Sequence, residues 1–260
     1  MKIVVCAKYA LDVAELKISS GKPVLEGARR KVSDIDKNAV EAAISIKEKY
    51  GGIIKVLCFG PISAKEGLKE LLAMGADEAY LIEDPSEGML DTAATVEALA
   101  LAIQKMDGFD LILCGEATID GYTSQVGPRL AERLKVPQIT YVRSIKIDGN
   151  NVIAERDLED VYQTVKVPMP LLITVTREIN TPRIPNLMAI LKASKKPITI
   201  WKIEDLGLSK DKLEQISSLH TLSLEGFTVE RKRIIIKDKP VDEAVQELIS
   251  YLLKEKVLGV

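Results

Sequence analysis

One stretch of the chain has the residue types and spacing of a phosphate-binding loop. The segment at residues 114–134 follows directly on an apolar run and leads into a helical pattern; its sequence is CGEATIDGYTSQVGPRLAERL. Its residues with a flexible backbone or a hydrogen-bonding side chain are Gly115, Asp120, Gly121, Thr123, Ser124, Gln125 and Gly127. Because a helix N-terminus presents unpaired N–H groups and a positive dipole end, the pattern indicates capture of a diphosphate.

This spacing is neither GxGxxG nor GxxxxGK[ST], so it identifies no particular nucleotide. An equally simple interpretation is an ordinary loop between strand and helix, with Asp120 or Thr123 capping the helix. The residues alone leave both interpretations open.

A second segment, VTREINTPRIPNLMAILKASKKPI (175–198), joins prolines to cations and apolar side chains. Pro182 and Pro185 favour an extended path. The cations are Arg177, Arg183, Lys192, Lys195 and Lys196, and the apolar residues are Ile184, Leu187, Met188, Ile190 and Leu191. This mixture predicts a docking surface. The alternative is a prolyl connection with core apolar residues and solvated lysines.

Short apolar runs alternating with helical patterns must position these segments. The runs are Lys2–Cys6, Ile53–Phe59, Ala79–Ile82 and Phe109–Cys114. A helix is expected from Met89 to Met106 between the third and fourth runs, with Asp91 or Thr92 capping its first turn. Helical spacing of apolar residues also precedes the second and third runs. The order predicts an α/β fold with a doubly wound, mostly parallel sheet, whose ligands bind at the carboxyl ends of the strands.

Beyond Pro137 the pattern changes to additional strands that pair as antiparallel neighbours. Runs at 138–143, 151–156, 162–167 and 171–175 are strand-like, and the turn residues at 148–151 predict a hairpin. We expect residues 1–200 to form the α/β domain and residues 201–260 a C-terminal segment with a helix at 241–254. That segment is either an arm on a partner subunit or a helix docked on its own domain.

Composition excludes several classes of protein. The chain has 260 residues, 47% of them hydrophobic, and 36 basic against 38 acidic side chains give a net charge of −2, so no global field favours nucleic acid. No secretory signal and no apolar run of ~18 residues is present, which predicts a cytoplasmic protein without membrane insertion. One histidine and no CxxC argue against a metal site, and we expect Cys6, Cys58 and Cys114 in the core. No catalytic motif is recognised, so a cofactor is expected to supply any reactivity.

The segments resemble those of electron transfer flavoprotein beta subunits. The strongest match is VTREINTPRIPNLMAILKASKKPI, supported by AKYALD, KNAVEAAISIKE, CFGP, LLAMGADEAY and DGYTSQVGPRLAERLKVPQITYV, in collinear order over about residues 1–205. The resemblance implies a heterodimer whose larger alpha subunit carries an electron-transferring FAD, while this chain binds AMP or a second FAD.

The resemblance also implies which residues hold the nucleotide. Matching positions are Cys6, Ala7, Ser33, Asp34, Asp36, Phe59, Gly60 and the stretch from Asp120 to Ala131, which includes Gly121. Within that stretch, contacts to phosphate and to ribitol or ribose are expected from Asp120, Thr123, Ser124, Gln125, Val126 and Gly127.

The loop DGxTxQVGP is similar to that of members whose beta subunit holds a bifurcating FAD, although Tyr122 stands where many relatives have Asp. The resemblance then implies that this FAD accepts a hydride from NADH. One electron would pass to a high-potential acceptor, an acyl-CoA dehydrogenase or quinone-linked oxidoreductase, and the other to ferredoxin or flavodoxin. A subunit holding structural AMP is the alternative.

By the same resemblance Leu187 is the apolar anchor for the acceptor, surrounded by Arg183, Lys192, Lys195 and Lys196. The C-terminal segment would contact the alpha subunit. An α/β protein of another class, one that binds a nucleotide for regulation or hydrolyses it, would leave the basic prolyl loop unexplained.

Overall fold

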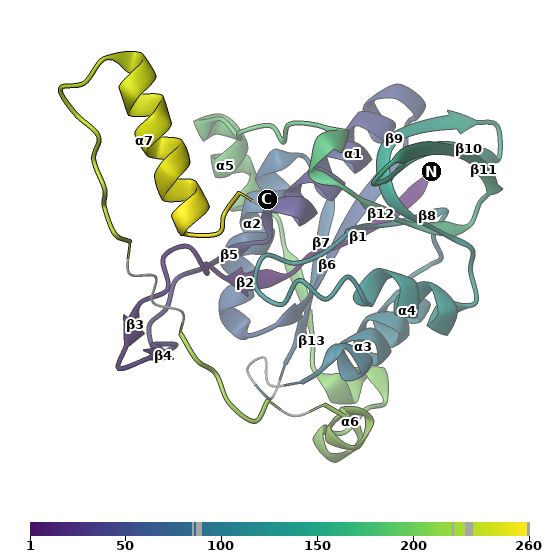
Figure 1. Cartoon of the computed structure of the whole chain (residues 1–260). Helices are drawn as coiled ribbons and strands as arrows, with labels where there is room; N and C mark the ends of the chain where they lie inside the picture. The colour runs from purple at the N-terminus through teal and green to yellow at the C-terminus, as the bar shows by residue number, and fades with distance from the viewer. Residues whose placement is uncertain (85, 87–89, 220, 227–230, 259–260) are drawn as a thin grey trace.

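A nine-stranded sheet forms the centre of the computed structural model, which describes residues 1–84, 86, 90–219, 221–226 and 231–258 (Figure 1). The strand order is β11-β10-β9-β12-β8-β1-β6-β7-β13. The bounds are β1 Lys2–Cys6, β6 Ile53–Gly60, β7 Glu78–Glu83, β8 Leu111–Gly115, β9 Gln138–Asp148, β10 Asn151–Leu158, β11 Val161–Pro168, β12 Leu171–Val175 and β13 Ile198–Trp201. Each strand predicted from the apolar runs is present.

Both faces of the sheet are buried under helices. In β1, Ile3 and Val5 join the core on one face, and Val4 and Cys6 join the core on the other. This explains why the strand is apolar throughout and does not alternate. The first face is covered by α1 (Asp34–Tyr50), α2 (Lys65–Met74) and α5 (Leu187–Ala193), the second by α3 (Thr92–Lys105), α4 (Val126–Leu134) and α6 (Lys210–Ile216).

The chain winds outward from β1 in both directions. It passes from β1 through α1 to β6 and through α2 to β7, then returns through α3 to β8 on the other side of β1. These strands are parallel, with Cys6 of β1 in register with Cys114 of β8. The reversal places a crevice at the carboxyl ends of β1, β6 and β8. The predicted doubly wound fold is confirmed.

An antiparallel extension widens the sheet beyond β12. The strand β10 pairs antiparallel with β9 and β11, and the predicted hairpin at 148–151 is the β9–β10 turn. The strand β12 then inserts parallel between β8 and β9. Two small antiparallel pairs follow β1: β2 (Tyr9–Leu11) with β5 (Arg30–Val32), and β3 (Ile18–Ser19) with β4 (Lys22–Pro23). The short 3-10 helices are η1 (Ile62–Ala64), η2 (Arg177–Ile179) and η3 (Ile203–Leu206).

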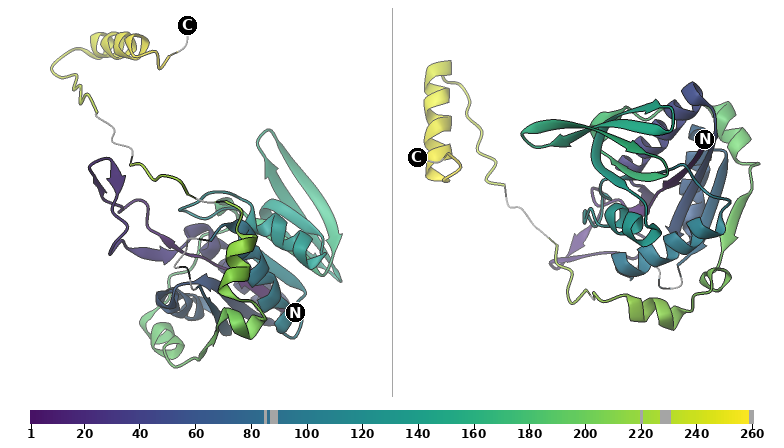
Figure 2. Two further views of the ribbon diagram at one scale, coloured as in Figure 1. Left: turned by 90° about the horizontal axis from the view of Figure 1, so that it is seen from below. Right: turned by 90° about the vertical axis from the view of Figure 1, so that its right-hand side faces the viewer.

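The C-terminal region has two parts with different packing. The first part continues the domain: β13, which the sequence did not predict, pairs with β7, and Leu206, Leu208 and Leu213 join the core beside α3. The second contains α7 (Val241–Lys254), which has no buried residue and stands away from the sheet in both views of Figure 2. The bounds of α7 agree with the predicted helix at 241–254.

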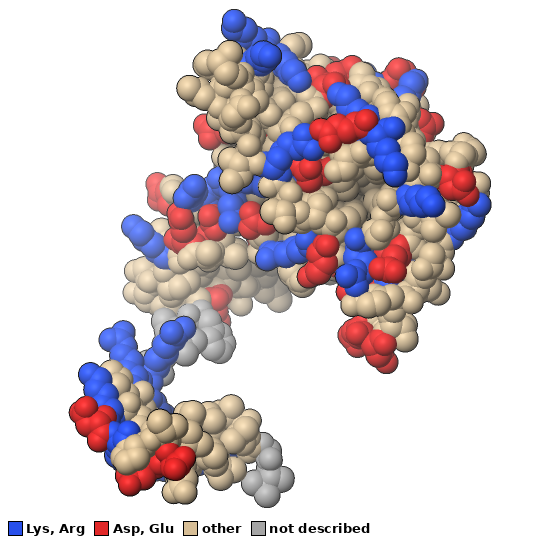
Figure 3. All heavy atoms as spheres, turned by 90° about the horizontal axis from the view of Figure 1, so that it is seen from above, with Lys and Arg blue, Asp and Glu red and all other residues tan. Residues whose placement is uncertain are grey.

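The surface carries both signs of charge. Figure 3 shows acidic and basic side chains interspersed on the face drawn, with the C-terminal part lying apart from the body. None of the helices among the described residues is long and apolar enough to cross a membrane.

Candidate functional site

A cavity of about 410 Å³ lies at the carboxyl ends of β1, β6 and β8, within the size range of cofactor sites. Eleven of the residues predicted to hold a nucleotide line it: Cys6, Ala7, Asp36, Phe59, Gly60, Gly121, Thr123, Ser124, Gln125, Val126 and Gly127. Residues from three strand ends and from the loop before α4 therefore meet at one site.

The other predicted residues do not line the cavity. Ser33 and Ala131 are fully buried, and Asp34 forms an ion pair with Lys31 at 3.2 Å. Ser33 precedes α1, and its side chain makes no capping hydrogen bond. Asp120 does not line the cavity and instead contacts residues that do.

Asp120 holds the loop in shape from behind. Its carboxylate pairs with Lys8 Nζ at 2.8 Å and accepts hydrogen bonds from Thr118 Oγ1 at 2.8 Å and from the Gly121 amide at 2.7 Å. Burial opposes the charge on Asp120, but Lys8 and these two donors outweigh burial and lower its pKa. The charged carboxylate of Asp120 therefore holds this loop in place beside the cavity.

The N-terminus of α4 opens on the cavity without a side-chain cap. Neither Asp120 nor Thr123 caps the helix, and Gln125 at the N-cap position makes no capping hydrogen bond. Val126 and Gly127, in the first turn, line the cavity. Their amides are thus left for a ligand, and an anion is the ligand that this end of a helix favours.

Two glycines permit close packing at this point. A Cβ on Gly127 would lie 2.4 Å from Thr174 Cγ2 of β12, and a Cβ on Gly115 would lie 2.6 Å from Asp36 Oδ1. The first contact brings α4 against the sheet, and the second brings α1 against the end of β8. Both approaches require the absence of a side chain.

Asp36, in the first turn of α1, joins two strand ends at the floor of the cavity. Its carboxylate accepts hydrogen bonds from the Lys8 amide at 2.9 Å and from the Gly115 amide at 3.0 Å. Only 4% of the residue is exposed, and burial raises its pKa to about 7 despite these two donors. Asp36 thus fixes the ends of β1 and β8 relative to α1.

The cavity also contains residues that the sequence did not predict. Lys8 follows β1 directly, so the strand-end rule could have included it. Thr92, at the start of α3, donates to Gln125 Oε1 at 2.8 Å and accepts from Arg129 at 2.8 Å. Leu219 and Thr221 reach the cavity from the C-terminal region, and no local pattern could have indicated that.

Asp91 holds in place the C-terminal segment that brings Leu219 and Thr221 to the cavity, which we call the C-terminal wall. One carboxylate oxygen caps α3 through the Ala93 amide at 2.9 Å, and the other accepts from the amides of Ser218 at 2.9 Å and Leu219 at 3.1 Å. The Asp91 amide in turn donates to Ser217 Oγ at 3.0 Å. One side chain therefore caps a helix and closes one side of the cavity.

Comparison with known proteins identifies the family. A family model for the electron transfer flavoprotein domain matches residues 24–206. An electron transfer flavoprotein subunit beta of Thermoanaerobacterium thermosaccharolyticum is 40% identical over 262 residues, covering 99% of this chain and 100% of the relative. The chain belongs to the electron transfer flavoprotein beta subunits.

Two further relatives extend the comparison. The caffeyl-CoA reductase-Etf complex subunit CarD of Acetobacterium woodii is 40% identical over 263 residues, covering 99% of this chain and 100% of the relative. The electron transfer flavoprotein subunit beta of Bacillus subtilis is 36% identical over 258 residues, covering 98% of each chain. Beta subunits pair with an alpha subunit, as the sequence resemblance implied.

The expected docking segment of this beta subunit is exposed. Leu187 is 71% exposed and Ile184 is 93% exposed, with Met188 beside them. We call Ile184, Leu187, Met188, Ile190 and Leu191, all exposed, the apolar patch. The alternative interpretation, in which these side chains belong to the core, is wrong.

The cations near the apolar patch differ in their surroundings. Lys192 and Lys195 are exposed, whereas Lys196 donates to the Ala76 carbonyl at 2.7 Å and is half-buried. Arg183 forms ion pairs with Glu41 at 2.9 Å and Glu48 at 2.7 Å. Lys192 and Lys195 are therefore the exposed charges beside the apolar patch, and Arg183 has its own partners within the chain.

The cysteines lie in the interior, as predicted. Cys6, Cys58 and Cys114 are all buried and unpaired. A hydrogen bond with Cys6 and burial raise the pKa of Cys114, and burial raises that of Cys58 to about 12. The thiols of Cys58 and Cys114 are therefore protonated at neutral pH, and all three buried cysteines act as small apolar residues.

Proposed function

We propose that the cavity holds an adenine-containing cofactor, FAD, with its diphosphate at the N-terminus of α4. The observation that carries the proposal is the uncapped first turn of α4, where Val126 and Gly127 line the cavity. Lys8, at the same cavity, adds a positive charge braced by Asp120. The side chains of Thr123, Ser124 and Gln125 line the cavity, and we expect them to donate hydrogen bonds to the phosphates and ribitol.

The flavin would supply hydride acceptance and one-electron transfer when bound, while the chain binds and orients it. We propose NADH as the donor, and ferredoxin or flavodoxin together with an acyl-CoA dehydrogenase or quinone-linked oxidoreductase as acceptors. The similarity to a subunit of a caffeyl-CoA reductase-Etf complex supports a reductase-linked role. A beta subunit holding structural AMP is the alternative, because the same helix N-terminus suits one phosphate as well as two. The cytoplasm is the proposed location.

Counting cofactors in the purified heterodimer tests this proposal. Two FAD per heterodimer would support a flavin in the beta subunit, and one FAD with one AMP would support the alternative. A heterodimer whose beta subunit retains no adenine-containing molecule would contradict the proposed cavity function.

We propose that the apolar patch docks the acceptor dehydrogenase, with Lys192 and Lys195 steering the encounter. An exposed apolar side chain among cations can recognise a partner without holding it tightly, which suits repeated association and release. We expect Leu187→Ala to raise the KM for the dehydrogenase by about tenfold, the loss of about 1.4 kcal/mol. Val161→Ala, at an apolar side chain that is 58% exposed on the edge strand β11, is the matched control. An unchanged KM in Leu187→Ala would contradict the docking role.

We propose that α7 and the residues around it form the arm that contacts the alpha subunit. The arm begins after Thr221, because the segment from β13 to α6 packs on the α/β domain and Leu219 and Thr221 line its cavity. Val241, Val245 and Leu248 are spaced to share one face of α7, and all are exposed. An apolar helix face of this kind is stabilised when a partner covers it.

A further inference from the structure

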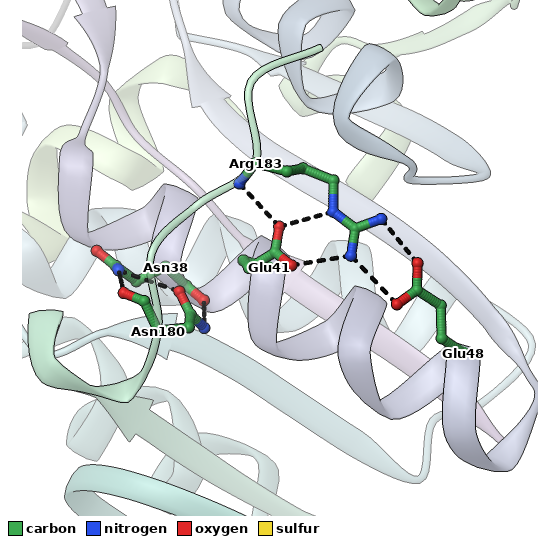
Figure 4. Close-up of polar contacts among 5 residues, drawn as sticks. All are labelled: Asn38, Glu41, Glu48, Asn180 and Arg183. Carbon is green, nitrogen blue, oxygen red and sulfur yellow. Dashed lines mark hydrogen bonds and ion pairs between the residues drawn. The ribbon is translucent and has the colours of Figure 1, made fainter.

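Arg183 ties the prolyl segment to α1 through one nearly buried carboxylate. The backbone amide and Nε of Arg183 donate to Glu41 Oε2 at 3.0 and 2.9 Å, and Nη2 donates to Glu41 Oε1 at 2.9 Å (Figure 4). Glu41 is only 7% exposed. Such a bidentate pair fixes the orientation of the guanidinium as well as its position.

Two further contacts extend this attachment along α1. Glu48, two turns beyond Glu41, accepts from Arg183 Nη1 at 2.7 Å. Towards the other end of the helix, Asn38 Nδ2 donates to the Asn180 carbonyl at 2.8 Å and Asn180 Nδ2 donates to the Asn38 carbonyl at 3.0 Å. We call the contacts of Asn38, Glu41, Asn180 and Arg183 the clamp, and the exposed Glu48 adds an outer contact to Arg183; Figure 4 shows the prolyl segment lying across α1 at these contacts.

The clamp ends where the apolar patch begins. Ile184 follows Arg183 directly, and Leu187 starts the short helix α5 three residues later. In α5 only Ala193 is buried, and the helix packs on α2. The position of Leu187, the first residue of α5, also depends on how the chain enters the helix, and the clamp contributes to that entry.

The helix that bears the clamp also forms the floor of the cavity. Asp36 binds the Lys8 and Gly115 amides at the cavity, and Glu41 lies five residues further along the same helix. At 1.5 Å per residue, these side chains lie about 7.5 Å apart along the axis of α1. An α-helix of this length is stiff, so α1 connects the two sites directly.

We propose that Arg183, held by Glu41, is a positioning residue for electron delivery: the clamp fixes the apolar patch relative to the cofactor cavity through α1. This inference rests on the docking role proposed for the patch. It changes the role expected for Arg183, whose charge is neutralised by carboxylates of its own chain and does not serve to steer a partner. A displaced patch would weaken productive docking of the acceptor without touching the cofactor.

Variants of the clamp in the holo-heterodimer test the proposal. Arg183→Gln alone would leave Glu41 nearly buried and unpaired, so the informative variant is the double Glu41→Gln with Arg183→Gln, which leaves no unpaired charge in that site. Glu48→Gln is the matched control, because its side chain is 59% exposed and it contacts the outer side of Arg183. Leu187→Ala is measured in parallel.

The readouts separate positioning from stability. With an acyl-CoA dehydrogenase that the unaltered heterodimer reduces, we expect the double variant to raise the KM at least fivefold, and Glu48→Gln to change it less than twofold. Flavin content and reduction of ferricyanide, a small acceptor that needs no docking, should stay unchanged. Amide hydrogen exchange over residues 184–191 should become faster than in the unaltered heterodimer.

The outcomes distinguish this inference from the docking proposal on which it rests. If Leu187→Ala raises the KM while the double variant leaves it within twofold, the clamp does not position the patch and the inference is overturned. If Leu187→Ala also has no effect, the docking role itself fails. A parallel loss of ferricyanide reduction in the double variant would show a general structural role and would equally overturn the inference.

Discussion

Replacing Gly127 by Ala crowds the packing of α4 on β12 beside the proposed cofactor cavity. The new Cβ would lie 2.4 Å from Thr174 Cγ2, a separation that forces one of the two elements to move. Thr174 is 2% exposed, and its hydroxyl accepts a hydrogen bond from the Tyr141 amide at 3.2 Å, so rotating the side chain would break that bond. We therefore expect α4 to shift away from β12.

The cost of crowding Thr174 can be compared with the gain in helix propensity from Gly to Ala. Overpacking of this kind costs roughly 1–3 kcal/mol, whereas exchanging Gly for Ala in a helix gains at most about 1 kcal/mol. The difference is a net loss of up to about 2 kcal/mol, which would lower the Tm of a chain of this size by up to about 8 °C. Because the first turn of α4 moves with the helix, retention of the adenine cofactor should fall as well.

The assay is thermal unfolding of the purified heterodimer together with cofactor content after gel filtration. Gly121→Ala is the matched control: Gly121 lines the same cavity, but its Cβ would meet nothing closer than Thr118 Oγ1 at 3.8 Å. Equal Tm and equal cofactor content in the Gly127 and Gly121 variants would refute the packing argument.

Two other predictions follow from the cavity floor and the arm. Burial raises the pKa of Asp36 to about 7, above the ordinary value, so the folded state binds this proton more tightly and the free energy of unfolding falls as pH rises from about 4 to about 7. Denaturant titrations across that range should show a flatter decline for Asp36→Asn, and an equal decline would contradict the assignment. Leu248→Glu should weaken heterodimer assembly at least tenfold by analytical ultracentrifugation, whereas Glu247→Gln should not; equal assembly would argue against the arm.

The sequence was sufficient for most strands of the sheet and for part of the cavity lining. Buried parallel strands are apolar on both faces, so runs such as Lys2–Cys6 and Leu171–Val175 could be read directly. The carboxyl ends of such strands meet at one edge, which is why Cys6 and Phe59 were correctly grouped with the loop before α4.

Long-range polar partnerships could not be predicted in this way. Arg183 and Glu41 are 142 residues apart, and neither has a local pattern that distinguishes a paired charge from a solvated one. The strand β13 was missed because it is only partly buried and because its place at the edge of the sheet is set by its pairing with β7. Leu219 reaches the cavity only because Asp91 holds the chain there.

The contacts of Asp91 make the cofactor cavity and the C-terminal region energetically dependent on each other. Leu219 and Thr221 line the cavity, and the chain continues from them towards α7. A cofactor that contacts these residues favours the closed wall, and a partner that favours the closed wall raises cofactor affinity by the same factor, since coupling free energy is reciprocal. A partner that favours an open wall would, by the same coupling, lower the affinity for the cofactor, and the order in which subunit and cofactor are added would not alter the final complex.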